Sequence, residues 1–320
     1  MRLKPIHATA AVTALVAAAA AAGCSGGSKS GTGNVQVFIT PEDSIVSGIP
    51  AGTADGSNVD NWTVTYNDFL INFSDFRAHP AGNPSNSLED TASDVLDLFQ
   101  VGANGYVFKE FDGVSAVRYD KVGYDIAVAT STAQVISSVT NAADAAAMVS
   151  SGYAILFDLT MTNPSGQSCT PGTTNCVTEH TVHLRMGIPS GTHFDDCSPA
   201  SGAAGFAVPS GGTAQIKPTI HGDHWFFINF PHGANESPVR RAQWLANADL
   251  DHNGEVTVAE LTSASAANLF PSSFTDGFAG YDLSGALGTV NNGYDFIVNE
   301  SHTLGHFEGD GDCATRTVIP

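Results

Sequence analysis

Oxygen-bearing side chains recur at regular intervals in residues 249–260, DLDHNGEVTVAE. They stand at the first, third and fifth positions, a glycine at the sixth permits a sharp turn, and a glutamate closes the twelfth. The expected ligands are Asp249, Asp251, Asn253, Glu255 through its backbone carbonyl, and Glu260. Because every donor is an oxygen, this spacing predicts a site for a hard cation, calcium in particular.

The residues on both sides of this loop predict helices. Ser237 and Pro238 suit the start of an entering helix over 237–248, and Thr257 with Glu260 forms a capping box for an exiting helix. Residues 237–268 therefore resemble a single EF-hand. Since the sequence holds no second loop of this kind, the resemblance implies a structural calcium clamp rather than a paired sensor. A chance match in an acidic surface loop is the alternative.

Histidines are the second group with metal-binding chemistry. Nine of the 11 follow residue 175, and imidazole nitrogen is a preferred ligand of zinc and copper. His302 and His306 are four residues apart, so both rings would share one face of a helix expected over 291–306. This pair is the best placed in the sequence.

His221 and His224 enclose Gly222-Asp223, which can turn the chain and bring both rings to one point. We therefore predict a four-nitrogen zinc or copper site, with Asp223 or Glu300 orienting the rings. The predicted ligands are His221, His224, His302 and His306. Four separate histidines with satisfied hydrogen bonds are the alternative.

The other histidines are weaker candidates. His180 and His183 should face opposite sides of a strand over 177–188, which argues against joint chelation. His193 and His232 have no clear partner in sequence. His252 occupies a non-ligand position of the calcium loop and is expected to point to solvent.

Residues 1–23 have the pattern of a signal peptide, with Arg2 and Lys4 before a short apolar stretch over 8–22. The stretch ends at Cys24 in a setting that resembles a bacterial lipobox, so residues 24–34 are expected to be a lipidated cysteine and a flexible tether. Ser25, in place of a retention aspartate, favours the outer membrane. Ordinary secretory cleavage near the same site is the alternative.

The charge balance is strongly acidic. Removing Arg2 and Lys4 from the 12 bases leaves 10 against 32 acids, a net charge of −22. Such a surface repels nucleic acid and anionic lipid and attracts divalent cations. The alternative is that the negative charge only keeps an exported protein soluble.

Four cysteines remain besides Cys24, and an even number in an oxidising compartment favours two disulfides. Cys169 and Cys176 enclose a turn-rich hexapeptide, so they are the expected local pair, and by elimination Cys197 would join Cys313. A four-thiolate zinc site is the alternative, with spacing too irregular to favour it.

Strand patterns dominate the rest of the chain and predict a mainly β fold, with a β-sandwich-like body over 35–236 and a C-terminal segment, 269–320, packed on it. The buried parity switches at Asn67-Asp68, which predicts a bulge within an extended segment from Trp62 to Phe73. Further strands are expected at 35–40, 106–111, 117–129, 153–162, 177–188 and 214–230. Helices are expected at 141–150, around the calcium loop and near the C-terminus.

Residues 113–129, GVSAVRYDKVGYDIAVA, are similar to a strand pair found in exported β-sandwich proteins that include the copper-associated MbnP-like group. The whole chain resembles uncharacterised bacterial lipoproteins with a β-rich body, one EF-hand loop and a histidine-rich C-terminal half. That resemblance implies no established activity.

The sequence lacks the familiar catalytic motifs: it has no HExxH, no G-x-S-x-G and no phosphate-binding glycine loop. We expect an exported, lipid-anchored protein that holds calcium structurally and a zinc or copper ion through histidines, and the lack of these motifs favours a binding protein over an enzyme without deciding between them. Two alternatives stay open: a metal-dependent extracellular hydrolase, and a calcium-braced envelope scaffold or adhesin.

Overall fold

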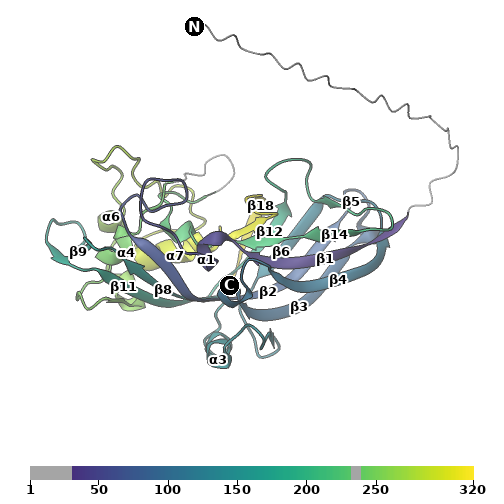
Figure 1. Ribbon diagram of the computed structural model, residues 1–320, viewed down its shortest axis with the longest axis horizontal. Helices are drawn as coiled ribbons and strands as arrows, with labels where there is room; N and C mark the ends of the chain where they lie inside the picture. The colour runs from purple at the N-terminus through teal and green to yellow at the C-terminus, as the bar shows by residue number, and fades with distance from the viewer. Residues whose placement is uncertain (1–30, 232–238) are drawn as a thin grey trace, which may run out of the picture.

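The computed structural model describes residues 31–231 and 239–320. The expected signal peptide, Cys24, most of the tether, His232 and the helix start at Ser237-Pro238 lie outside the described residues. Within them the fold is mainly β, 42% strand and 17% helix, and β-sandwich-like, as the strand patterns predicted. The molecule is elongated, with most helices gathered in one half (Figure 1).

The smaller of the two main sheets has five strands in the order β14-β1-β15-β17, with β4 also paired to β1. Its strands are β1 (Thr32–Pro41), β4 (Tyr106–Ser115), β14 (Thr213–Ile216), β15 (Pro218–Ile220) and β17 (Gly305–Phe307). Strand β1 lies at the centre of this sheet and pairs along its length with β4, β14 and β15.

The larger sheet has nine strands in the order β16-β11-β8-β2-β6-β12-β18, with β3 paired to β2 and β7. Its strands are β2 (Thr63–His79), β3 (Leu88–Asp97), β6 (Lys121–Ile126), β7 (Gln134–Val135), β8 (Ile155–Thr162), β11 (Thr181–Ile188), β12 (Gly191–Cys197), β16 (Glu255–Val256) and β18 (Cys313–Ile319). Two short pairs complete the β structure: β5 (Arg118–Tyr119) with β13 (Phe206–Ala207), and β9 (Gln167–Cys169) with β10 (Cys176–Thr178).

The helices are short. They are α1 (Asp43–Val46), α2 (Leu98–Val101), α3 (Ala142–Ser151), α4 (Gln243–Asn247), α5 (Val258–Ser263), α6 (Ala266–Leu269) and α7 (Gly293–Ser301), with 3-10 turns η1 (Pro84–Asn86) and η2 (His224–Phe226). In the described residues, none has the length and apolar character required to cross a bilayer.

The long strand β2 carries the predicted bulge. Its pairing with β8 shifts register between Tyr66 and Asp68, so Tyr66 and Phe69 both point into the core although they are three residues apart. The inserted residue, Asn67, bonds outward to the carboxylate of Asp158 at 2.6 Å. The alternation of side chains along a strand leaves no other way to bury both rings.

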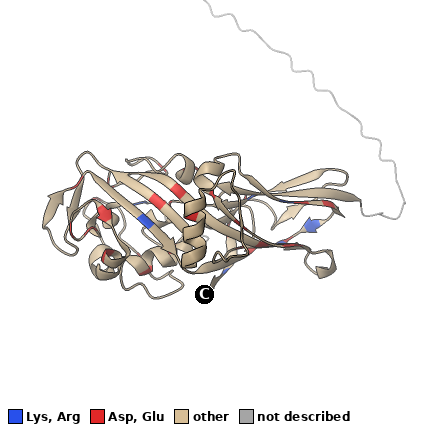
Figure 2. Ribbon diagram, turned by 90° about the horizontal axis from the view of Figure 1, so that it is seen from below, with Lys and Arg blue, Asp and Glu red and all other residues tan. Residues whose placement is uncertain are grey.

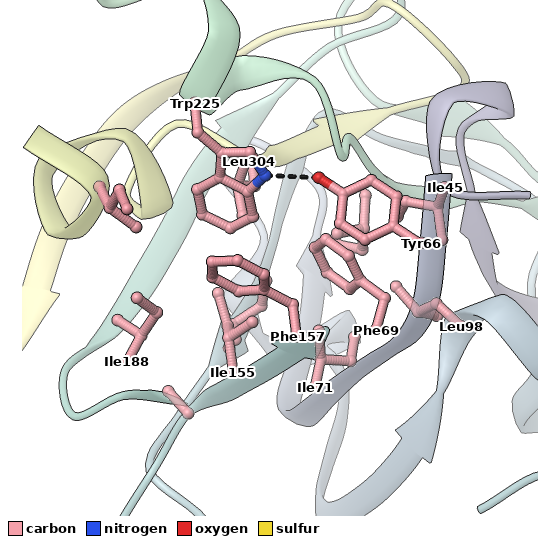
Figure 3. Close-up of a cluster of buried hydrophobic side chains, with 14 of the residues drawn as sticks. Ile45, Tyr66, Phe69, Ile71, Leu98, Ile155, Phe157, Ile188, Trp225 and Leu304 are labelled. Carbon is pink, nitrogen blue, oxygen red and sulfur yellow. Dashed lines mark hydrogen bonds between the residues drawn. The ribbon is translucent and has the colours of Figure 1, made fainter. Parts of the chain in front are cut away.

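Aromatic side chains fill the core between the sheets and the helical half. Trp225 stacks on Phe157 with ring centroids 4.6 Å apart, and its indole N–H donates to the hydroxyl of Tyr66 at 2.5 Å (Figure 3). That hydroxyl in turn donates to the backbone carbonyl of Gly222. Each large side chain buried here contributes roughly 1.5–3 kcal/mol of hydrophobic stabilisation, and the hydrogen bonds fix the position of the segment that follows β15.

Helix α3 covers a separate patch of the large sheet. Ala145 and Met148 are buried against Leu70 and Leu156, and the side chain of Asn141 caps the first turn. The predicted helix over 141–150 is confirmed to within one residue.

Figure 2 shows the distribution of charged residues on the ribbon. In that view acidic residues outnumber basic ones.

Both predicted disulfides are confirmed. Cys169–Cys176 joins β9 to β10, and Cys197–Cys313 joins β12 to β18 across 116 residues of sequence. The second bond anchors the C-terminal strand, which was not predicted as a strand, in the large sheet.

Several expected elements are divided or shorter. Residues 117–129, 177–188 and 214–230 each hold two short strands rather than one, and the last of these segments leaves the sheet at η2. The strands β3, β12 and β18 were not expected, because their sequences are rich in aspartate, serine or threonine. Register within an existing sheet determines them more than their own composition does.

Candidate metal centres

Three of the four predicted histidines reach one point from two paired strands and the turn that follows. His221 comes directly after β15, His224 begins η2, and His306 is the middle residue of β17, which pairs antiparallel with β15. Gly222 is required between the first two, since a Cβ there would stand 2.6 Å from Cγ1 of Ile45.

The three imidazole rings are in mutual contact. Ring centroids are 4.0 Å apart for His221 and His306, 5.1 Å for His224 and His306, and 5.2 Å for His221 and His224. One ring nitrogen from each lies within 4.8 Å of the other two. All three side chains are buried, and His224 is fully enclosed. The structure therefore brings together three of the predicted nitrogen ligands.

Each ring also keeps one nitrogen unpaired. Among the described residues, Nε2 of His221, Nε2 of His224 and Nδ1 of His306 are buried and have no hydrogen-bond partner. A buried polar atom without a partner costs about 1–3 kcal/mol, so three of them on three rings in mutual contact call for an explanation. A shared metal ion would use all three lone pairs.

The hydroxyl of Thr303 fixes the protonation of His224. It donates to the backbone carbonyl of Glu300 at 2.7 Å, and it lies 2.7 Å from Nδ1 of His224. Because a hydroxyl has a single proton, it must accept a hydrogen bond from Nδ1–H. Nε2 of His224 then carries the lone pair, as metal ligation requires.

Asp223 places a negative charge beside the rings. Arg240 holds one carboxylate oxygen, Oδ2, at 2.6 and 2.7 Å, while Oδ1 lies 3.8 Å from Nδ1 of His221 and 3.9 Å from Nε2 of His224. Burial opposes the charge of Asp223, but His221, His224 and Arg240 outweigh it and hold the pKa of this carboxyl well below its usual range. Among the described residues Oδ1 of Asp223 has no hydrogen-bond partner, so Asp223 acts on the rings by its charge, whereas Thr303 bonds His224 directly and links it to Glu300.

Burial keeps two of the rings neutral. It lowers the pKa of His306 to about 3 and that of His224 well below its ordinary value, in both cases with a smaller contribution from a neighbouring histidine. Burial also lowers the pKa of His221, but Asp223 reverses the effect and the net shift is upward. Neutral imidazole is the form that binds a metal ion.

A cavity of about 320 Å³ reaches one of the three rings, that of His221. It is lined by Glu42, Asp55, His221, Asp223, Phe227, Arg240 and Asp310. Glu42, His221 and Asp223 form a second group of possible ligands that overlaps the first at His221. Four carboxylates beside one guanidinium make this opening favourable for cations.

His302 does not join the group, and the helical argument for it is wrong. Helix α7 ends at Ser301, so His302 and His306 do not share a helix face. Nδ1 of His302 instead lies 2.7 Å from Oγ1 of Thr192 on β12. Burial lowers the pKa of His302 to about 4, as expected for a core histidine with a satisfied hydrogen bond.

The oxygen-rich segment 249–260 is the second candidate metal centre. Carboxylate oxygens of Asp249, Asp251 and Glu260 lie within 4.8 Å of one another. Gly254 has φ +86°, the turn that its position predicted. Asp249 is fully buried and accepts the backbone N–H of Gly254 at 2.8 Å and that of Asn253 at 3.3 Å.

The helix that leaves this loop begins as the sequence predicted. Thr257 and Glu260 form the predicted capping box at the start of α5. Glu255 and Val256 form β16, which pairs with β11, and the side chain of Glu255 lies 2.7 Å from Nδ1 of His183. The loop is thereby joined to the edge of the large sheet.

The entering side differs from the expectation. Helix α4 covers only Gln243–Asn247, and residues 239–242 are not helical. Trp244 and Leu245 are buried, as predicted. A single turn is enough here because the hairpin β9–β10 packs against it, with the backbone N–H of Cys169 donating to Asn247 at 2.9 Å.

Sequence analysis missed Glu179, a carboxylate from outside the loop. Burial and the neighbouring carboxylate of Asp249 raise the pKa of Glu179. Two neighbouring carboxylates disfavour each other's charged form, and a bound cation would relieve that repulsion. Only the topology, which brings the segment before β11 against the loop, could reveal it.

Three further histidines, His183, His193 and His252, contact polar side chains of neighbouring residues. His252 is half-buried rather than solvent-facing, because its Nδ1 lies 3.0 Å from Oγ of Ser168. His183 contacts the carboxylates of Asp158 and Glu255, and Nδ1 of His193 lies 2.7 Å from Asp125. The structure brings none of these described rings into the three-histidine group.

The sequence matches no protein-family model, no curated protein and no solved structure.

Proposed function

We propose that this protein binds a transition metal ion, zinc or copper, through His221, His224 and His306. Two observations on the described residues carry the proposal: the three buried histidines each offer a ring nitrogen within 4.8 Å of the other two, and each ring has one nitrogen without a hydrogen-bond partner. Neutral nitrogen donors with a nearby carboxylate suit both metals, and Asp223 would offset part of the ion's charge.

We further propose that calcium braces the fold at residues 249–260. Asp249, Asp251 and Glu260 supply carboxylates, and Asn253 with the Glu255 carbonyl completes the set that the spacing predicts. Support comes from the convergence of the three carboxylates, the positive φ of Gly254 and the neighbouring Glu179. We assign calcium a structural role because β16, which is part of the loop, pairs with β11 of the large sheet.

Export and membrane anchoring through lipidated Cys24, in the outer membrane, complete the proposal and rest on the sequence. The two disulfides support an oxidising compartment outside the cytoplasm. The acidic surface argues against nucleic acid as a partner. Ordered from the membrane outward, the chain would be a lipid anchor, a tether and a metal-binding body.

The test is metal analysis of protein purified without a histidine tag, followed by zinc and copper(II) titration calorimetry on the metal-free form. We expect one transition metal per chain, lost in His306→Gln. His302→Gln is the matched control, since it removes a buried histidine four residues away that lies outside the group. Retention of binding in His306→Gln, or loss only in His302→Gln, would refute the three-histidine site.

A metal-dependent hydrolase is the second candidate, and the cavity beside His221 favours it. Three protein ligands and an accessible fourth position are typical of catalytic zinc. In that case the zinc-loaded protein should cleave activated ester substrates faster than His306→Gln does. Equal rates for the two proteins would leave the binding function alone.

A further inference from the structure

A second cavity, of about 360 Å³, lies away from the three-histidine group between α4 and the segment that follows α6. Apolar atoms make up most of its exposed wall, and Trp244, Phe274 and Leu269 are among the residues that supply them. Its remaining lining includes Asp60, Arg241 and Tyr281. A concave, mostly apolar site with a few polar groups is the usual form of a small-molecule pocket.

Each of those three residues has one unpaired side-chain atom that solvent does not reach. Within the described part of the chain, Oδ1 of Asp60, Nε of Arg241 and the hydroxyl of Tyr281 are buried and without a hydrogen-bond partner. Arg241 and Tyr281 are only 5% and 8% exposed. They are also close enough to influence one another: after burial, Asp60 and Arg241 are the main charges acting on the pKa of Tyr281.

The groups are held in place by bonds that leave those atoms free. The other oxygen of Asp60 accepts the backbone N–H of Gln243 at 2.8 Å. The guanidinium of Arg241 lies 3.6 Å from the ring centre of Phe274 and bonds Asp276 through Nη2. The unpaired atoms are therefore an acceptor, a donor and a hydroxyl, and the first two belong to side chains that other contacts hold in place.

Charge selects the ligand class. An anion would be attracted by Arg241 and repelled by the carboxylate of Asp60. A cation would be attracted by Asp60 and repelled by Arg241. A zwitterion would have to bury two charges where burial already raises the pKa of Asp60. Neutral hydroxyl groups can donate to Asp60, accept from Arg241 and do either with Tyr281.

We propose that this cavity is a binding site for a neutral carbohydrate, with Asp60, Arg241 and Tyr281 as its hydrogen-bonding residues and Trp244 in its wall. Asp60 and Gln243 also line a more open neighbouring cavity of about 460 Å³. The site thus has room for more than one sugar ring. The proposal is independent of both metal centres.

The experiment titrates the full-length protein with glucose, galactose, mannose, N-acetylglucosamine, maltose and cellobiose, followed by calorimetry and tryptophan fluorescence. For a ligand of this size we expect a Kd of about 1 mM or lower for at least one sugar. Tyr281→Phe should weaken that sugar about tenfold or more, and Asp60→Asn should do the same. The control is Tyr106→Phe. Tyr106 lies in β4 of the five-stranded sheet and does not line this cavity, so this variant should bind the sugar as the wild type does.

A second measurement separates a binding role from a structural one. If the hydroxyl of Tyr281 has no partner in the free protein, Tyr281→Phe should melt at the same temperature as the wild type or higher. A clear drop in its melting temperature would show that the hydroxyl holds the fold together. That result, no binding by any of the sugars, or binding of glycine or acetate in their place would overturn the proposal.

Discussion

Oγ1 of Thr303 lies 2.7 Å from Nδ1 of His224 and donates its proton to the Glu300 carbonyl. Removing this hydroxyl should free the ring of His224 without removing a ligand. We expect Thr303→Val to weaken zinc binding about 10- to 100-fold, the usual effect of losing a residue that orients a metal ligand. Competition titration with a zinc chelator measures it.

Thr192→Val is the matched control for this change. Thr192 makes the same kind of bond, at 2.7 Å, to His302, which lies outside the three-histidine group. Its loss should lower stability modestly and leave zinc affinity unchanged. Equal losses of affinity in the two variants would mean that Thr303 acts only through the fold.

Glu260→Gln tests the calcium loop. Glutamine keeps the capping box with Thr257 but removes the charge that closes the loop. We expect the wild type to gain about 2.7 kcal/mol of stability at calcium 100-fold above its Kd, and the variant to gain little. Thermal melts with and without calcium measure this. Glu89→Gln, on the exposed surface of β3, should respond to calcium as the wild type does.

Glu179→Gln should have effects of opposite sign with and without calcium. In the absence of the ion, loss of the repulsion between Glu179 and Asp249 should raise the melting temperature. With the ion present, affinity should fall, because one nearby negative charge is gone. Melts at a series of calcium concentrations would show the two curves crossing, and parallel curves would place Glu179 outside the site.

The parts of this structure that local sequence determines were predicted well. The bulge near Asn67, the helix α3, the capping box at Thr257 and the turn at Gly254 each follow from the residues that form them. The local disulfide follows from a short turn in the same way.

What depends on pairing between distant segments was predicted less well. His306 was placed on a helix because its spacing to His302 suits one, yet its backbone pairs with Thr219 in a strand. Three of the predicted histidines meet nonetheless, because β15 and β17 are neighbours. Thr303, Glu179 and the cavity at Tyr281 needed the tertiary structure, since no spacing in the sequence marks them.

The two disulfides should differ in their contribution to stability. In the chain-entropy model, the bond that closes 116 residues stabilises the fold by about 4–5 kcal/mol and the one that closes 7 residues by about 2 kcal/mol. We therefore expect Cys197→Ser with Cys313→Ser to lower the melting temperature far more than Cys169→Ser with Cys176→Ser does. The reverse order would show that the hairpin β9–β10 is the more important support of the helical half.

Asp94 makes a testable contribution to the pH dependence of stability. Burial, with a smaller effect of Asp90, raises the pKa of this carboxyl from 3.8 to about 6. The folded protein then binds a proton that the unfolded chain does not at pH values between about 4 and 6, so this group's contribution to stability falls as pH rises through that window. At pH 7.5 the charge is present and costs stability. Asp94→Asn should therefore be about 1–3 kcal/mol more stable than the wild type at pH 7.5, given about 1.36 kcal/mol for each pKa unit, and should match it near pH 4. Urea unfolding of both proteins at the two pH values measures the difference, and a constant gap between them would contradict the assignment.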